Sequence, residues 1–180
     1  MKIINHLIDD QYPPFKEEPN VREIVRAVVL NSNDEVALTH LLADDMFGHR
    51  DYYELPGGGI EEGESRLEAL QREIQEEVGY TIKLIGEIGT VIDYYNLLKR
   101  ENHNHYYLVR AVDYVGRTPT ENELRLIDKL VWVTLEQAIR LFNAHPDSGL
   151  AKLVKARELP VLLEAKRIYQ EKLEHDNLSH

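Results

Sequence analysis

The chain has 180 residues, of which 43% are hydrophobic and 29% charged, and these values are typical of one soluble globular domain. A formal net charge of −11 disfavours broad electrostatic binding to nucleic acid or to anionic membranes, because an acidic surface repels phosphate groups. The lack of cysteine excludes disulfide bonds, thiolate catalysis and cysteine-ligated zinc, and it is compatible with a reducing compartment.

Residues 1–20 are expected to form an extended lead-in, because Pro13, Pro14 and Pro19 disfavour regular structure around them. Acidic residues occur early in this segment and it has no long apolar run, so it is not expected to act as a signal peptide. No part of the chain approaches a run of about 18 apolar residues, so no transmembrane helix is predicted. We therefore expect a cytoplasmic protein without a membrane partner.

β-Branched residues, alternating patterns and turn signals predict strands over much of the chain between residues 21 and 133. The two longest runs, 81–95 and 103–115, are separated by a polar loop and are expected to pair antiparallel. The other predicted strands are 21–30, 35–42, Asp51–Leu55 and a short segment near Leu130–Val133.

A helix is predicted over about residues 66–78. Ser65 and Glu68 have the S-x-x-E spacing of a capping box, and Gly79 suits the left-handed residue that follows a helix. At 100° per residue, four apolar side chains share one face, which is expected to pack on the sheet: Leu67, Leu70, Ile74 and Val78.

Helical patterns also fill the C-terminal part of the chain. Thr134 is expected to cap a helix that runs to about Phe142. Residues 149–180 form a predicted helical extension, interrupted before Pro160, which suits the first position of a new helix. An apolar stripe on this extension either covers the core or forms a homodimer contact: Leu162, Ala165, Ile168, Tyr169 and Leu173.

These elements predict a single domain over residues 1–180 with an α/β (α+β mixed) fold. Because strands and helices do not alternate as repeating βαβ units, a purely parallel sheet is not expected. We expect instead a mixed β-sheet with helices packed on it.

Three glutamates of the predicted helix, Glu73, Glu76 and Glu77, fall on a face beside the apolar one. Like charges at these spacings destabilise a helix by roughly 0.2–0.5 kcal/mol per pair. Taken alone, the cluster is more simply interpreted as a solvated acidic face. The glycine run 57–59 just before the helix allows backbone to approach a ligand closely, and hard oxygen ligands suit Mg²⁺ or Mn²⁺. A metal site is therefore the second interpretation.

The same residues resemble a known motif. Gly58, Glu64 and the run Arg72–Tyr80 match the Nudix box pattern G-x5-E-x7-R-E-U-x-E-E-x-G-U, where U is a bulky apolar residue. Every fixed position matches, and only Tyr80 departs, as an aromatic where an aliphatic residue is commoner. The preceding stretch from Tyr53 to Gly58 resembles the lead-in of the Nudix family, with tyrosine where tryptophan is frequent.

The resemblance implies a Nudix-like α/β/α sandwich and an enzyme, a pyrophosphohydrolase with Mg²⁺ as cofactor and Mn²⁺ as a possible substitute. It implies that Glu73, Glu76 and Glu77 hold metal, together with a carbonyl of Gly57 or Gly58. It also implies that Arg72 orients a carboxylate and that Glu64 braces the junction between loop and helix. The segments 1–20 and 149–180 lie outside the resemblance.

The expected reaction is attack of water on a pyrophosphate bond in a nucleoside diphosphate linked to another group, such as a nucleoside triphosphate, ADP-ribose or a nucleotide sugar. Two of the metal-binding glutamates, Glu76 and Glu77, are candidates for the general base. Later acids provide three more: Glu121, Glu123 and Asp128.

Residues that contact substrate are less well defined. Five candidates are Glu54, Arg50, Tyr95, His103 and His105. Stacking on a nucleobase would suit the tyrosine and the histidines, but a partly buried place in a strand is the simpler interpretation of both histidines. Two other classes of function remain open, a catalytically silent nucleotide sensor on the same fold and an acidic interaction domain without metal. The expected partner is a small nucleotide and not nucleic acid.

Overall fold

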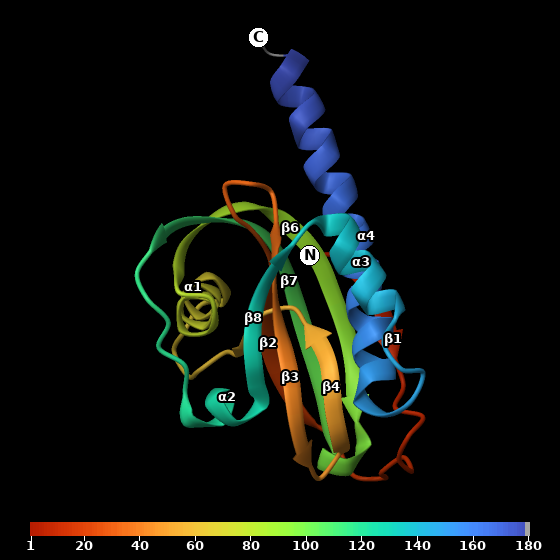
Figure 1. Cartoon of the computed structure of the whole chain (residues 1–180). Helices are drawn as coiled ribbons and strands as arrows, with labels where there is room; N and C mark the ends of the chain where they lie inside the picture. Colours follow the sequence, from red (N-terminus) through yellow and green to blue (C-terminus); the bar gives the residue numbers. More distant parts are fainter. Residues whose placement is uncertain (179–180) are drawn as a thin grey trace.

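The computed structural model describes residues 1–178 and has a central mixed β-sheet with helices on both faces (Figure 1). The strands are β1 (Ile3–Leu7), β2 (Asn20–Leu30), β3 (Val36–Asp45), β4 (Gly48–Glu54), β5 (Gly57–Gly59), β6 (Tyr80–Tyr95), β7 (Arg100–Tyr114) and β8 (Ile127–Val133). The helices are α1 (Arg66–Glu77), α2 (Glu121–Leu126), α3 (Leu135–Asn143) and α4 (Gly149–Leu178), with a short 3₁₀ turn at Asn96–Leu98.

The sheet order is β1-β6-β7-β2-β3-β4, with β5 paired to β2 and β8 paired to β3. Strands β6 and β7 pair antiparallel, as predicted, whereas β1 and β6 are parallel and so are β2 and β7. Strand β2 meets β3 only where Leu30 faces Val36, and further along it pairs with β5 instead. The sheet therefore separates at β2, and the glycine segment β5 lies at the point of separation.

Helix α1 begins and ends where the sequence predicts. Ser65 and Glu68 form the capping box, and Gly79 has the left-handed φ of +88°. Leu70 and Ile74 are fully buried, but Leu67 is 49% exposed and its expected place in the core is wrong. The buried face of the helix is rotated toward Glu73 and Glu77, which are each only 7% exposed. The acidic face is therefore turned into the protein.

Two apolar clusters lie on opposite faces of the sheet. Between α1 and the sheet, Leu70, Ile74 and Val78 pack with Val25 and other strand residues. On the other face, α3 and α4 cover a larger cluster that includes residues of β2, β3, β6 and β7 (Figure 1). This arrangement is the predicted α/β/α sandwich.

Helix α4 is continuous, so the prediction of an interruption before Pro160 is wrong. A proline inside a helix removes one hydrogen bond and crowds the preceding turn. Here the helix continues because Val154, before the proline, and Leu162 and Ala165, after it, are buried in the same core. Ile168 also packs on this core, so the apolar stripe mainly covers its own chain, and its last member Leu173 is 45% exposed.

Three further elements differ from the sequence-based expectation. The lead-in contains strand β1, which pairs with β6. Strands β3 and β4 extend beyond the predicted ranges 35–42 and 51–55 and meet in a tight hairpin, and the segment between β7 and β8, where no helix is predicted, contains α2, which Thr120 caps. Residues 179 and 180 of the predicted extension lie outside the described residues. Within residues 1–178, no helix is both long and apolar enough to cross a membrane.

Candidate active site

The site is built on the glycine turn between β4 and α1. Gly57 has a φ of +142°, and a Cβ atom there would lie 2.1 Å from the carbonyl oxygen of Val25. A Cβ atom on Gly58 would lie 2.4 Å from a carboxylate oxygen of Glu73. Glycine is therefore needed at Gly57, where the turn lies directly against the backbone of β2, and a side chain at Gly58 would displace the Glu73 carboxylate from the acidic face of α1.

A cavity of about 470 Å³ opens beside this turn. Its wall includes residues of all the strands except β1, together with the glycine turn, the acidic face of α1, α2 and one residue of α4. The cavity therefore lies where the sheet separates at β2, and segments from both halves of the chain contribute to it.

Three carboxylates gather at one side of the cavity. Oxygen atoms of Glu73, Glu76 and Glu123 all lie within 4.8 Å of one another. Burial is the main cause that raises the pKa of Glu73 and of Glu76, and the negative charge of Glu123 raises both further. A divalent cation would relieve this repulsion, and three carboxylates with room for water suit Mg²⁺ or Mn²⁺. The residues present therefore fit the metal that the Nudix box implies.

Arg72 connects the carboxylates to the glycine turn. Its guanidinium donates to Glu64 at 2.7 and 2.9 Å, to Glu73 at 2.7 Å and to the carbonyl of Gly59 at 3.0 Å. The hydrogen bonds from Arg72 lower the pKa of Glu64 to about 2. Glu64 also accepts from the backbone N–H of Glu61 at 2.9 Å, so this pair ties the loop before α1 to the helix.

Glu77 lines the same cavity but is held differently. Its carboxylate accepts a hydrogen bond of 2.9 Å from the backbone N–H of Gly57, and burial raises its pKa well above the usual value. Glu77 is not one of the three carboxylates that lie within 4.8 Å of one another. Glu123, which the sequence offers only as a candidate base, is the third member of that group.

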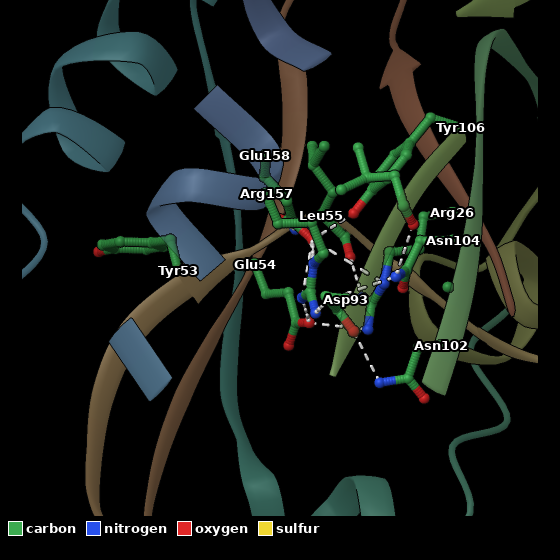
Figure 2. A network of polar contacts seen from close by, with 12 residues as sticks. Arg26, Tyr53, Glu54, Leu55, Asp93, Asn102, Asn104, Tyr106, Arg157 and Glu158 are labelled. Carbon is green, nitrogen blue, oxygen red and sulfur yellow. Dashed lines mark hydrogen bonds and ion pairs between the residues drawn. The ribbon is translucent and has the colours of Figure 1, made fainter. Parts of the chain in front are cut away.

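A buried network of charges lies deeper in the cavity wall (Figure 2). Arg157 of α4, 1% exposed, pairs with Glu54 of β4, with Asp93 of β6 at 3.0 Å and with Glu158 at 3.1 Å. Arg26 of β2 pairs with Glu54 at 2.7 Å. Burial would raise the pKa of Glu54, but Arg26 and Arg157 outweigh it and lower the pKa. Five charged groups from four elements therefore compensate one another in the interior.

The network also fixes the start of the glycine turn. Glu158 accepts a hydrogen bond of 2.7 Å from the backbone N–H of Leu55, and Arg26 donates to the carbonyl of the same residue at 2.9 Å. Helix α4 thus anchors the residue that lies two positions before Gly57.

The proposed substrate contacts separate into two groups. Arg50, Glu54 and Tyr95 line the cavity. His103 and His105 lie on the other face of β7, where they bond to Glu23 at 2.9 and 2.5 Å.

The proposed later acids separate in the same way. Glu123 lines the cavity, whereas Asp128 lies 3.1 Å from His40, and neither Asp128 nor Glu121 lines the cavity among the described residues.

Sequence reasoning missed Arg157 and the arginines of β2. Arg22, Ile24 and Arg26 occupy every second position of the strand, so all three side chains lie on the same face of the sheet. This signal was present in the sequence. For Arg157, the available signal was a charged pair, Arg157–Glu158, inside an otherwise apolar helix stripe.

Comparison with known proteins gives a consistent result. A family model described as NUDIX domain matches residues 21–153. A human protein named 8-oxo-dGDP phosphatase NUDT18 is 30% identical over 167 residues, 86% of this chain and 49% of its own length. An Escherichia coli protein named 8-oxo-dGTP diphosphatase is 41% identical over 59 residues, 33% of this chain and 44% of its own length. A zebrafish protein that is also named 8-oxo-dGDP phosphatase NUDT18 matches over 26% of its own length. The chain therefore spans about a quarter to a half of the length of these curated relatives.

Solved structures share the fold. A Nudix hydrolase from Nitrosomonas europaea has a TM-score of 0.59 at 16% identity, covering 84% of this chain and 89% of that one. The MutT protein from Methanosarcina mazei has a TM-score of 0.57 at 19% identity, covering 87% of this chain and 99% of that one. Since the family model spans most of the chain, and the glycine turn and acidic helix of its motif lie together in one cavity, this chain belongs to the Nudix family.

Proposed function

We propose that the protein hydrolyses a pyrophosphate bond in a nucleoside diphosphate derivative, with Mg²⁺ as cofactor and Mn²⁺ as a possible substitute. The observation that carries this proposal is the grouping of Glu73, Glu76 and Glu123 at one side of a cavity whose other walls contain arginines. Carboxylates that hold metal and arginines that hold phosphate are the two components that hydrolysis of a diphosphate needs.

The chain's own residues have distinct roles in this proposal. Glu73, Glu76 and Glu123 hold the metal, which when bound supplies a Lewis acid for the phosphate oxygens. Arg72 keeps Glu73 in place and is a positioning residue. Glu77 has one oxygen held by the N–H of Gly57, and its raised pKa suits it to accept a proton from the attacking water.

The substrate class is inferred from the relatives. The human and Escherichia coli relatives described above are named for 8-oxo-dGDP and 8-oxo-dGTP. We therefore place nucleoside di- and triphosphates of oxidised guanine ahead of ADP-ribose and nucleotide sugars. In this proposal residues 1–180 act as one cytoplasmic unit, with no nucleic acid or membrane partner and with a homodimer as one possible state.

The test is a panel of nucleotides and conjugates, including 8-oxo-dGDP, 8-oxo-dGTP, ADP-ribose and nucleotide sugars, incubated with Mg²⁺ or Mn²⁺ and analysed for products. Glu76→Gln should reduce turnover by orders of magnitude with an unchanged circular dichroism spectrum. Glu62→Gln removes an exposed acid in the loop before α1 that does not line the cavity, and it should retain wild-type turnover.

Failure to cleave any member of the panel would refute the proposal. Saturable nucleotide binding without cleavage would favour the alternative of a catalytically silent nucleotide sensor. Full activity in Glu76→Gln would remove that residue from the metal site.

A further inference from the structure

Six arginines line the cavity, and they differ in how their charges are compensated: Arg22, Arg26, Arg50, Arg72, Arg100 and Arg157. Arg26 and Arg157 share the buried network with Glu54, Asp93 and Glu158. Arg72 pairs with three glutamates, and Arg50 donates to Asp45 at 2.8 Å. Four of the six positive charges are therefore already neutralised by the protein.

Arg22 and Arg100 have no ion pair and no side-chain hydrogen bond with any residue in the range 1–178. The Nε atom of Arg100 is buried and has no hydrogen-bond partner among the described residues. Burial is the main cause that lowers the pKa of Arg22, and the positive charges of Arg100 and Arg26 lower it further. The two guanidinium groups therefore repel each other inside the cavity, and an anion bound between them would relieve the repulsion.

The fold places these two side chains together. In the parallel ladder of β2 and β7, Arg22 faces Asn102, and Arg100 is two residues before Asn102 on the same side of β7. Asn102 is 3% exposed and lines the cavity, and its Oδ1 has no hydrogen-bond partner among the described residues. Its amide nitrogen is fixed by a bond of 2.8 Å to Asp93 (Figure 2).

Arg22 also lies against the glycine turn. A Cβ atom on Gly59 would be 2.7 Å from a terminal nitrogen of the Arg22 guanidinium and 3.0 Å from its Nε. The charge of Glu73 acts on Arg22, although the two side chains form no ion pair. Arg22 is therefore close to the carboxylate group that we assign to metal, and Arg100 lines the same cavity.

We propose that Arg22 and Arg100 form a subsite for a terminal phosphate of the substrate, at the outer end of the phosphate chain whose diphosphate linkage the metal site holds. A terminal phosphate carries up to two negative charges near neutral pH, whereas each phosphate within a sugar-capped diphosphate carries one. Two uncompensated guanidinium groups match the terminal phosphate better, by charge and by bidentate geometry. This inference rests on the proposed function and narrows it to nucleoside di- or triphosphates over nucleotide sugars.

The first test uses inorganic pyrophosphate with EDTA-treated protein, so that no metal takes part, and measures binding by calorimetry. Wild type should bind saturably. Arg22→Gln and Arg100→Gln should each weaken binding by roughly tenfold, and the double variant should abolish it. Gly59→Ala should resemble Arg22→Gln, because the added methyl group displaces the guanidinium without removing its charge. Arg140→Gln removes an exposed arginine of α3 and should bind as wild type does.

The second test compares kcat/KM for GDP and GDP-mannose, which both release GMP when the diphosphate is cleaved. The preference for GDP should fall by roughly ten- to a hundredfold in the double variant, mainly through KM. A purely structural effect of the substitutions would reduce kcat/KM equally for both substrates.

Either of two outcomes of the binding test would overturn the subsite: absence of pyrophosphate binding in wild type, or variants that bind it as wild type does. An unchanged preference between GDP and GDP-mannose would also overturn it. If wild type cleaves neither nucleotide nor any other diphosphate, the proposed function fails, and the metal-free binding test still decides on the subsite.

Discussion

Arg72 shows how a single side chain sets the geometry of the site. It contacts Glu64, Glu73, Glu76 and the carbonyl of Gly59 at the same time. Arg72→Ala should lower kcat by at least tenfold, because Glu73 and Glu76 lose the group that orients them. Arg72→Lys keeps the charge but not the planar fork, and it should recover little activity. Steady-state kinetics measure both, and wild-type kinetics in Arg72→Ala would remove the positioning role.

His145 gives the fold a defined response to pH. It follows α3, is 6% exposed, and its Nε2 accepts the backbone N–H of Tyr53 at 3.2 Å. Burial and the charge of Lys155 lower its pKa to about 4. The unfolded chain, with a histidine pKa of about 6.5, takes up the proton first as pH falls. The contribution of neutral His145 to the free energy of unfolding is therefore complete above about pH 6.5 and is lost as the pH falls toward 4.

His145→Gln keeps an acceptor for the N–H of Tyr53 but cannot be protonated. Wild type should lose up to about 3 kcal/mol more of its free energy of unfolding than the variant does between pH 7 and pH 4. Urea denaturation at several pH values measures this difference. Parallel pH profiles for the two proteins would contradict the explanation.

At the scale of an element, α4 provides a comparison between two arginines with acidic partners. Arg157 is buried with Asp93 and Glu54, whereas Arg167 pairs with Glu164 and Glu171 on the surface. Arg157→Met leaves buried carboxylates without a counter-ion and should reduce the free energy of unfolding by about 3–5 kcal/mol. Arg167→Met should leave it nearly unchanged. Denaturant titration measures the free energy of unfolding of both variants. If Arg157→Met were as stable as Arg167→Met, the buried network would be dispensable for stability.

Element by element, the sequence predicts best what is local. Helix α1 could be located because its cap, its stop signal and its apolar spacing lie within one short segment. The spacing of Glu73 and Glu76 on that helix likewise places them together. Pro160 was misinterpreted because the packing of α4 on a distant core overrides a local breaker, and no local pattern reveals that packing.

The rest of the site depends on contacts between distant segments. Glu123 and Arg157 lie 50 and 84 residues after Glu73 in the chain, and only the folded sheet brings them to the same cavity. The rotation of α1 that buries Glu73 and exposes Leu67 is also set by tertiary packing. A helical projection gives relative angles between side chains but not the direction of the core.

At the scale of the whole molecule, metal binding should raise thermal stability. At a Mg²⁺ concentration about 100 times Kd, binding to the folded state adds about 2.7 kcal/mol. For a chain of this size that corresponds to a rise in Tm of about 5–10 °C. Glu73→Gln and Glu123→Gln should reduce the rise, whereas Glu121→Gln, which is exposed and does not line the cavity, should keep it. A wild-type Tm that does not respond to Mg²⁺ or Mn²⁺ would favour the acidic interaction domain.

Strand β2 has a consequence for how the chain can vary in length. Its residues alternate between the cavity, which receives Arg22 and Arg26, and the core under α1, which receives Val25 and Ala27. Inserting or deleting one residue within 22–26 would exchange these two sets. Guanidinium groups would then be forced under α1, while valine and alanine would face the cavity. We expect natural and engineered length changes to be tolerated in the turn after Leu30 and rejected inside this strand.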